Sequence, residues 1–149
     1  TGRKFTMNDG APFKKWVAEI DEFVASKKTD EFAAEFAMMA DAMVAFKSIV
    51  DMNAAWTTGD RQMKQLFATR TLHSAARVYC GMLLLDQAIL AAAKLKELGD
   101  DHFDANFYKG KIASARFYIM NHVTDIFGFE KSMKSGDRSS IDIPEASFM

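Results

Sequence analysis

Large apolar residues recur at helical intervals between positions 32 and 50. Each is separated from the next by alternating steps of four and three positions: Phe32, Phe36, Met39, Met43, Phe46 and Val50. Residues three and four apart lie on the same face of an α-helix, so this spacing gives a continuous apolar stripe that a neighbouring element must cover. With Thr29 as a capping residue and acidic residues just after it, the pattern predicts a bundle helix.

Glycine, proline and capping residues mark the ends of further helices. Pro12 suits the first turn of one helix, and Gly136 suits the end of the last. Asp60 is a capping residue for another helix, which Gly99 would end. The predicted helices cover residues 11–27, 30–57, 61–98 and 103–134. A break near Gly81 would shorten the third helix, and Gly110 and Gly128 make a straight fourth helix less favourable.

Four helices joined by short loops predict an all-α fold, an antiparallel up-down four-helix bundle. One domain is expected over 1–149, with a lead-in segment over 1–10 and an extended tail over 136–149. Only 2 Pro and 8 Gly occur in 149 residues, which argues against a β-sandwich rich in turns. The chain begins with Thr1, and we expect it to be a piece of a longer protein.

Charge and cysteine content exclude several classes of protein. The net charge of -1 argues against a nucleic-acid-binding surface, which needs a basic excess. One cysteine, Cys80, cannot form an internal disulfide, and no apolar signal sequence begins the chain. The longest nearly apolar run, 78–93, contains Asp86 and Gln87 and is short for a membrane span. A buried helix and a cytoplasmic location are therefore expected.

The histidines do not support a metal centre. A ferritin-like site needs a glutamate three residues before a histidine, whereas His73, His102 and His122 follow Arg70, Gly99 and Ile119. Zinc-ligand spacings are also absent from the sequence. His73 and His102 lie 29 positions apart, as two residues facing a haem could, but His102 follows Gly-Asp-Asp at a helix start. Surface or capping histidines are the simpler interpretation, and no catalytic, cofactor or metal residue is assigned.

Two groups of basic residues are candidates for contact with an anion or a partner. Arg70, His73 and Arg77 are spaced by three and four and share one helical face. The alternative is an ion-paired face that meets acidic residues of the preceding helix, such as Asp41 or Asp51. Lys109, Lys111 and Arg116 form the second group, in which Arg116 lies in an apolar segment and is expected to be paired. Cys80 lies among apolar neighbours, which favours a buried structural cysteine over a nucleophile.

Two segments resemble a known family. Residues 110–118 read GKIASARFY and residues 141–148 read IDIPEASF. They are similar to the "KIATARFY" helix and the "PEEAF" tail of the extra C-terminal helical domain in bacterial acyl-CoA dehydrogenases of the 3-methylmercaptopropionyl-CoA dehydrogenase type. Residues 1–4 and 8–10 also resemble the "GRK…GG" stretch that leads into that domain. Departures occur at Ser114, at Ser147 and around Gly128.

The resemblance implies an accessory domain rather than a complete enzyme. In such a parent protein, a base removes the α-proton of an acyl-CoA while the β-hydride passes to FAD, and both the flavin site and the catalytic glutamate lie before this domain. The resemblance implies packing on the catalytic domains, a second subunit and a homo-oligomer, with no nucleic acid, membrane span or cofactor here. Family-motif or interface residues would be Gly2, Arg3, Lys4, Lys111, Arg116, Phe117, Tyr118 and Phe148. The alternative is a free-standing helical module that binds a partner or a small ligand.

Overall fold

The computed structural model describes residues 7–149, and every regular element in this range is helical. The main helices are α2 (Ala11–Ser26), α3 (Ala33–Thr58), α4 (Arg61–Leu98), α5 (Ala105–Tyr118) and α6 (Asp125–Lys134). Short elements lie between and beyond them: η1 (Met7–Gly10), η2 (Asp30–Phe32), η3 (Ile119–Val123), α7 (Ser139–Asp142) and η4 (Glu145–Phe148). The all-α prediction is therefore confirmed over the described residues.

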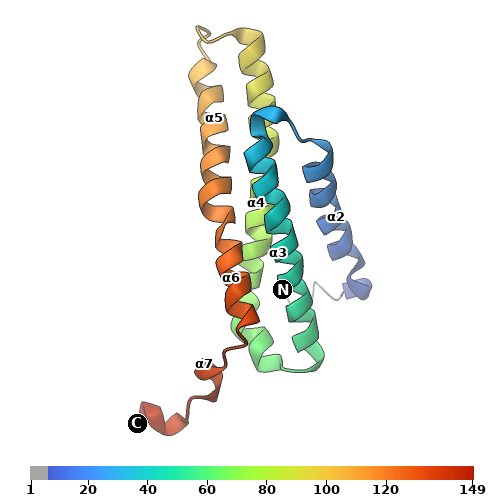
Figure 1. Cartoon of the computed structure of the whole chain (residues 1–149), viewed down its shortest axis with the longest axis vertical. Coiled ribbons are helices and arrows are strands. Elements are labelled where there is room, and N and C mark those ends of the chain that lie inside the picture. Colours follow the sequence, from blue (N-terminus) through green and yellow to red (C-terminus); the bar gives the residue numbers. More distant parts are fainter. Residues whose placement is uncertain (1–6) are drawn as a thin grey trace.

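Three long rods make up the centre of the bundle. In Figure 1, α3, α4 and the α5–α6 rod lie alongside one another, and α2 stands at the edge beside α3. The colours show the chain turning back at each connection between these rods. The most extensive packing is between α4 and α5, followed by α3 against α4. The long helix α4 is therefore the element around which the others assemble.

Local sequence explains where α4 begins and ends. The carboxylate of Asp60 accepts hydrogen bonds from the backbone N–H groups of Gln62 and Met63, at 3.1 and 3.2 Å. These bonds satisfy two of the amides that have no partner within the helix. At the other end, Gly99 adopts a φ of 82°, a conformation open to glycine at little steric cost. Both ends agree with the residues that predicted them.

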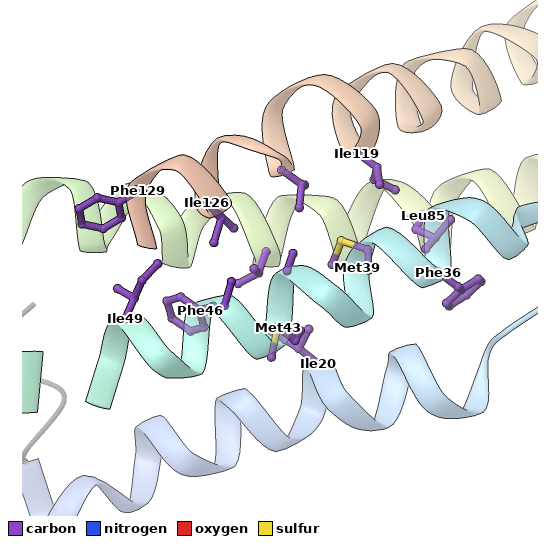
Figure 2. Close-up of a cluster of buried hydrophobic side chains, with 14 of the residues drawn as sticks. Ile20, Phe36, Met39, Met43, Phe46, Ile49, Leu85, Ile119, Ile126 and Phe129 are labelled. Carbon is purple, nitrogen blue, oxygen red and sulfur yellow. The ribbon is translucent and has the colours of Figure 1, made fainter. Parts of the chain in front are cut away.

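The hydrophobic core is built from all of the long helices. Figure 2 shows Ile20 of α2, Leu85 of α4, and Ile119 and Ile126 from the last rod converging on the α3 stripe. Five of the stripe residues predicted from the spacing are buried, and Val50 is partly buried. Asn53 of α3 donates a buried 2.6 Å hydrogen bond to the Thr71 hydroxyl of α4. This polar pair inside the core joins the two helices and was not predicted.

The break that Gly81 made possible does not occur, because α4 continues through it without interruption. Gly81 is buried where a Cβ would lie 2.7 Å from the Met39 sulfur and 3.2 Å from a methyl carbon of Val123. The glycine therefore allows helices to approach closely rather than breaking one. The interruption lies instead in the region predicted as a fourth helix, where η3 is a π-helical turn between α5 and α6.

The C-terminal tail is not simply extended, as the sequence predicted, because it contains the short helical turns α7 and η4. Arg138 forms an ion pair with Asp142 one turn later and another with Asp60 at the start of α4. The i, i+4 pair stabilises a helical turn where no apolar stripe exists. Beyond it the chain leaves the bundle (Figure 1), and Phe148 remains 75% exposed.

The described part of the chain has one helix, α4, that is long and apolar enough to cross a membrane by length and composition alone. A third of the most apolar window is buried inside the bundle. The expected burial of this segment is thus confirmed for one of its faces only.

Candidate functional surface

An apolar surface lies on the side of α4 that faces away from the core. The inner residues of α4 recur at steps of three and four, whereas large apolar residues also occupy the opposite side. Their exposed fractions are 54% for Leu72, 40% for Tyr79, 40% for Leu83 and 62% for Leu90, and the Tyr79 ring lies 5.9 Å from that of Trp16 in α2. The steps of seven, four and seven between them keep these residues on one face of the helix. This helix is apolar on two sides.

The same apolar surface extends onto α5. Lys111 donates a 3.2 Å hydrogen bond to the Gln87 side chain of α4, and its ammonium nitrogen lies 5.5 Å from the centre of the Phe107 ring. Phe107 is therefore near the part of α4 between Leu83 and Leu90, and it is 61% exposed. We call Leu72, Leu83, Leu90 and Phe107 the outer apolar surface. Exposed apolar side chains gathered in this way are typical of a contact with another protein surface.

Arg116 holds the start of α3 against α5, as its apolar surroundings predicted. Its guanidinium lies 3.2 Å from the Glu35 carboxylate and donates a 3.3 Å hydrogen bond to the Glu31 carbonyl oxygen. It also lies 5.4 Å from the centre of the Phe32 ring. Because Glu35 is buried, Arg116 supplies the positive charge that this carboxylate needs. A family-motif residue thus has a structural role in this domain.

Tyr118 and Phe117 lie near the π-helical turn. The Tyr118 ring is 5.3 Å from that of His122, and the Phe117 ring is 5.6 Å from His122 in an edge-on arrangement. Burial raises the pKa of the Tyr118 hydroxyl, and its interaction with Cys80 raises it further. Phe117 is 60% exposed. Of this pair, Tyr118 packs on α4 whereas Phe117 is available for contact.

Cys80 is exposed, so the expectation of a buried cysteine is wrong. Its neighbours Val78 and Gly81 are buried, but Cys80 lies on a different side of the helix and interacts with Tyr118. An apolar local sequence therefore did not reveal the orientation, because both faces of α4 are apolar.

Arg70, His73 and Arg77, which the spacing placed on one helical face, line one groove, and their partners are not on α3. Arg77 pairs with Asp125 of α6 at 2.8 Å, rather than with Asp41 or Asp51. Arg70 donates a 3.3 Å hydrogen bond to the Ser132 hydroxyl, and its guanidinium carbon is 4.4 Å from the centre of the Phe129 ring. The groove has a volume of about 600 Å³ and lies between α4 and α6.

The remaining predicted contact residues are dispersed. Phe148 lies in the exposed tail, far along the chain from Lys111 and Arg116. Gly2, Arg3 and Lys4 lie outside the described residues. No group of three His, Cys, Asp or Glu side chains within 7–149 is arranged to hold a metal ion. His102 accepts a 3.1 Å hydrogen bond from the Asp104 backbone N–H, which is a capping role.

The position of the outer apolar surface is what reasoning from sequence missed. A signal for it was present, since apolar residues of the 61–98 helix follow two separate helical stripes rather than one. The groove was missed for another reason: it depends on Gly128 and Phe129 of α6, which are distant in sequence from the basic residues.

Comparisons with known proteins identify the family of this chain. The chain matches the family described as acetyl-CoA dehydrogenase C-terminal like over residues 16–144. It is 68% identical over 149 residues to a butyryl-CoA dehydrogenase of Syntrophomonas wolfei subsp. wolfei, covering 100% of this chain and 24% of that protein. A second butyryl-CoA dehydrogenase of the same organism is 58% identical over 147 residues, covering 99% of this chain and 24% of that protein.

The chain therefore spans about a quarter of the length of the curated relatives it matches. The family match covers the helices of the bundle except the first turn of α2, all of the GKIASARFY segment and the first half of the IDIPEASF segment. The chain belongs to the acetyl-CoA dehydrogenase C-terminal-like family, which confirms the resemblance drawn from those two segments.

Proposed function

We propose that this domain packs against the catalytic body of an acyl-CoA dehydrogenase and shapes the assembly of its subunits. The observation that carries the proposal is the outer apolar surface, which the bundle itself leaves uncovered. Relatives four times as long as this chain provide further protein that could cover it. Burying a leucine side chain contributes about 1.5–3 kcal/mol, so several such contacts would fix the position of the domain.

The parent protein would carry out α,β-dehydrogenation of an acyl-CoA with FAD, in the cytoplasm. FAD, when bound, accepts the hydride, and we assign its site to the rest of the parent protein. The groove between α4 and α6, about 600 Å³, is open and has one aromatic ring, Phe129, in its wall. A flavin needs an enclosed, largely apolar pocket around its ring system. This groove does not fit that requirement, so no step of the reaction is derived through it.

The role of this chain would therefore be structural. The bundle provides a rigid body, and Leu72, Leu83 and Leu90 provide the apolar contact on α4. Phe148 and Ile143 of the tail, which are 75% and 43% exposed, offer a second contact away from the bundle. A stable contact between subunits needs about 1,000 Å² of total buried surface, which such a combination of face and tail could supply.

Hydroxyl-radical footprinting of the intact protein tests this proposal, since it measures the solvent accessibility of individual side chains. Leu83, Leu90 and Phe107 should be oxidised several-fold more slowly than Val44, because the contact covers them. Val44 is a matched internal control, being an apolar residue on α3 that is 69% exposed. Equal oxidation of Val44 and the leucines in the intact protein would contradict the proposed packing.

Variants provide a second test. Leu83→Gln combined with Leu90→Gln should weaken subunit assembly of the intact protein, measured by sedimentation, because two apolar contacts become polar. Val44→Gln should leave assembly unchanged. Unchanged sedimentation of the double variant would count against a role for the outer apolar surface in assembly.

A further inference from the structure

The groove between α4 and α6 has the features of a binding site for a small anionic molecule. Arg70, His73 and Arg77 form its α4 side, and Thr124, Asp125, Gly128 and Phe129 form its α6 side. Its volume of about 600 Å³ lies in the range of small-molecule sites. A shallower depression continues beside it, lined by His73, Arg77, Tyr118 and His122. Two histidines and two arginines therefore border one continuous strip of surface.

The charges in the groove are not balanced. Arg77 is offset by Asp125, whose carboxylate lies 2.8 Å away. Arg70 is held by neutral groups, the Ser132 hydroxyl and the Phe129 ring, and among the described residues no carboxylate forms an ion pair with it. The guanidinium of Arg70 is thus positioned in the groove with its charge uncompensated. A positioned arginine with free donors favours an oxyanion.

Gly128 keeps this groove open. It lies in α6, where a glycine is less favourable than an alanine. A Cβ added at Gly128 would have no heavy atom within 4 Å, so close packing does not require the glycine. Any larger side chain there would project from the wall of the groove into its space. The absence of a side chain at Gly128 therefore leaves the groove unfilled, and it is not required by the packing of the helices.

The wall that carries Thr124 and Asp125 is set by the π-helical turn. η3 ends at Val123, directly before these residues, and Thr124 donates a 3.5 Å hydrogen bond to the Met120 carbonyl oxygen inside that turn. A π-helical turn shifts the register of the side chains that follow it and is frequent at functional sites. The groove therefore lies at the point where the last rod departs from regular α-helix.

We propose that this groove binds the phosphate group of a small phosphorylated molecule. Arg70, His73 and Arg77 present donors at three successive positions along the wall, and a phosphate offers three terminal oxygens where a carboxylate offers two. The remaining volume accommodates the body of the ligand against the Phe129 side. This site is distinct from the outer apolar surface, so it stands or falls independently of the proposed packing.

Calorimetric titration of the intact protein with inorganic pyrophosphate and inorganic phosphate, at fixed ionic strength, tests the proposal. Pyrophosphate should bind saturably and more tightly than phosphate, because it carries more charge and more acceptor oxygens. Arg70→Gln should weaken this binding about tenfold or more, since it removes a charged donor. Asp125→Asn should strengthen it several-fold, because Arg77 is then released and a repelling carboxylate is lost.

Gly128→Leu should remove the same binding by filling the groove. Gly110→Leu is the matched control: Gly110 is also a helical glycine with no heavy atom within 4 Å of an added Cβ, but it does not line the groove. It should leave pyrophosphate affinity unchanged. Failure of pyrophosphate to bind saturably, unaltered binding in both Arg70→Gln and Gly128→Leu, or equal affinity for citrate would each overturn the proposal.

Discussion

Glycines inside the helices of this domain have different surroundings, and these surroundings decide what a methyl group would do. At Gly81 an added Cβ meets Met39 and Val123 in the core, whereas at Gly110 and Gly128 it meets nothing within 4 Å. The intrinsic preference of a helix for alanine over glycine is the same at all three positions, about 0.5–1 kcal/mol. Differences in stability among alanine variants at these three positions should therefore come from packing alone.

We predict that Gly110→Ala and Gly128→Ala each raise the free energy of unfolding by about 0.5–1 kcal/mol. Gly81→Ala should lower it by about 1 kcal/mol, because the cost of overpacking exceeds the gain in helix propensity. Urea denaturation of the three variants measures this order. A Gly81→Ala variant as stable as Gly110→Ala would show that Met39 moves aside freely.

Arg116 should be important for stability because of the carboxylate it neutralises. Replacing it by glutamine leaves Glu35, whose side chain is 9% exposed, without its ion-pair partner. We predict a loss of about 2 kcal/mol in the free energy of unfolding for Arg116→Gln. Arg116→Lys should recover only part of it, since an ammonium cannot reproduce the contacts with Glu35 and the Glu31 carbonyl together.

Lys96→Gln is the matched control for Arg116→Gln. Lys96 pairs with Glu31 in the same region, but both side chains are solvent-exposed, at 75% and 36%. An exposed pair of this kind contributes about 0.5 kcal/mol or less. Similar losses for Lys96→Gln and Arg116→Gln would contradict the importance of burial at Glu35.

Individual residues were the least predictable level of this domain. The spacing of Arg70, His73 and Arg77 correctly placed them on one wall, because helical periodicity is a local property. Their partners Asp125 and Ser132 could not be predicted, since they depend on which helix lies beside α4 and in what register. The prediction that Cys80 is buried failed for a related reason. Because α4 has two apolar faces, the spacing of its apolar residues does not show which face lies in the core.

At the scale of elements, an ion pair within α6 lies beside Ser48 of α3. Lys134 forms an ion pair with Glu130 at 2.6 Å. Hydrogen bonding by Lys134, aided by the Ser48 hydroxyl, lowers the pKa of Glu130 below its ordinary value, and partial burial opposes this effect. A carboxyl with a lowered pKa in the folded state stabilises the fold above its unfolded pKa and loses that contribution as the pH falls through the folded value.

We therefore predict that Glu130→Gln is less stable than the unmodified chain at pH 7, by about 0.5 kcal/mol. The difference should shrink as the pH falls below about 4, where the carboxyl becomes protonated in both states. Urea denaturation at pH 7 and pH 3 checks the sign. A difference that grows toward acid would contradict the lowered pKa of Glu130.

Helices were the most predictable level. A regular apolar stripe gives a strong signal for α3, and the boundary residues Asp60 and Gly99 of α4 act as expected. Thr29 does not act as the capping residue that the sequence predicted, because its side chain makes no capping hydrogen bond. The π-helical turn in the last rod had no comparable signal in the sequence, because apolar residues continue at helical spacing before and after η3. A local change of register leaves the composition of a helix unaltered.

At the scale of the whole molecule, the bundle and the tail should behave as separate parts. Residues 143–149 are all exposed, and in Figure 1 they lie away from the helices. We predict that ending the chain after Asp142 changes the free energy of unfolding of the bundle by no more than about 0.5 kcal/mol. Urea denaturation of the shortened chain measures this. A larger loss would show that the tail folds back onto the bundle.

Because Cys80 is exposed, the proposed packing of this domain on its parent protein would also change how readily the thiol is oxidised. Cys80 is exposed on the same turn of α4 as Leu83, which belongs to the surface that we propose is covered in the intact protein. A thiol in that position is open to peroxide and to disulfide exchange only while the surface is bare. A domain separated from its parent would then join in pairs through Cys80 under oxidising conditions. Assembly would thus protect the protein from covalent cross-linking as well as hold its parts together.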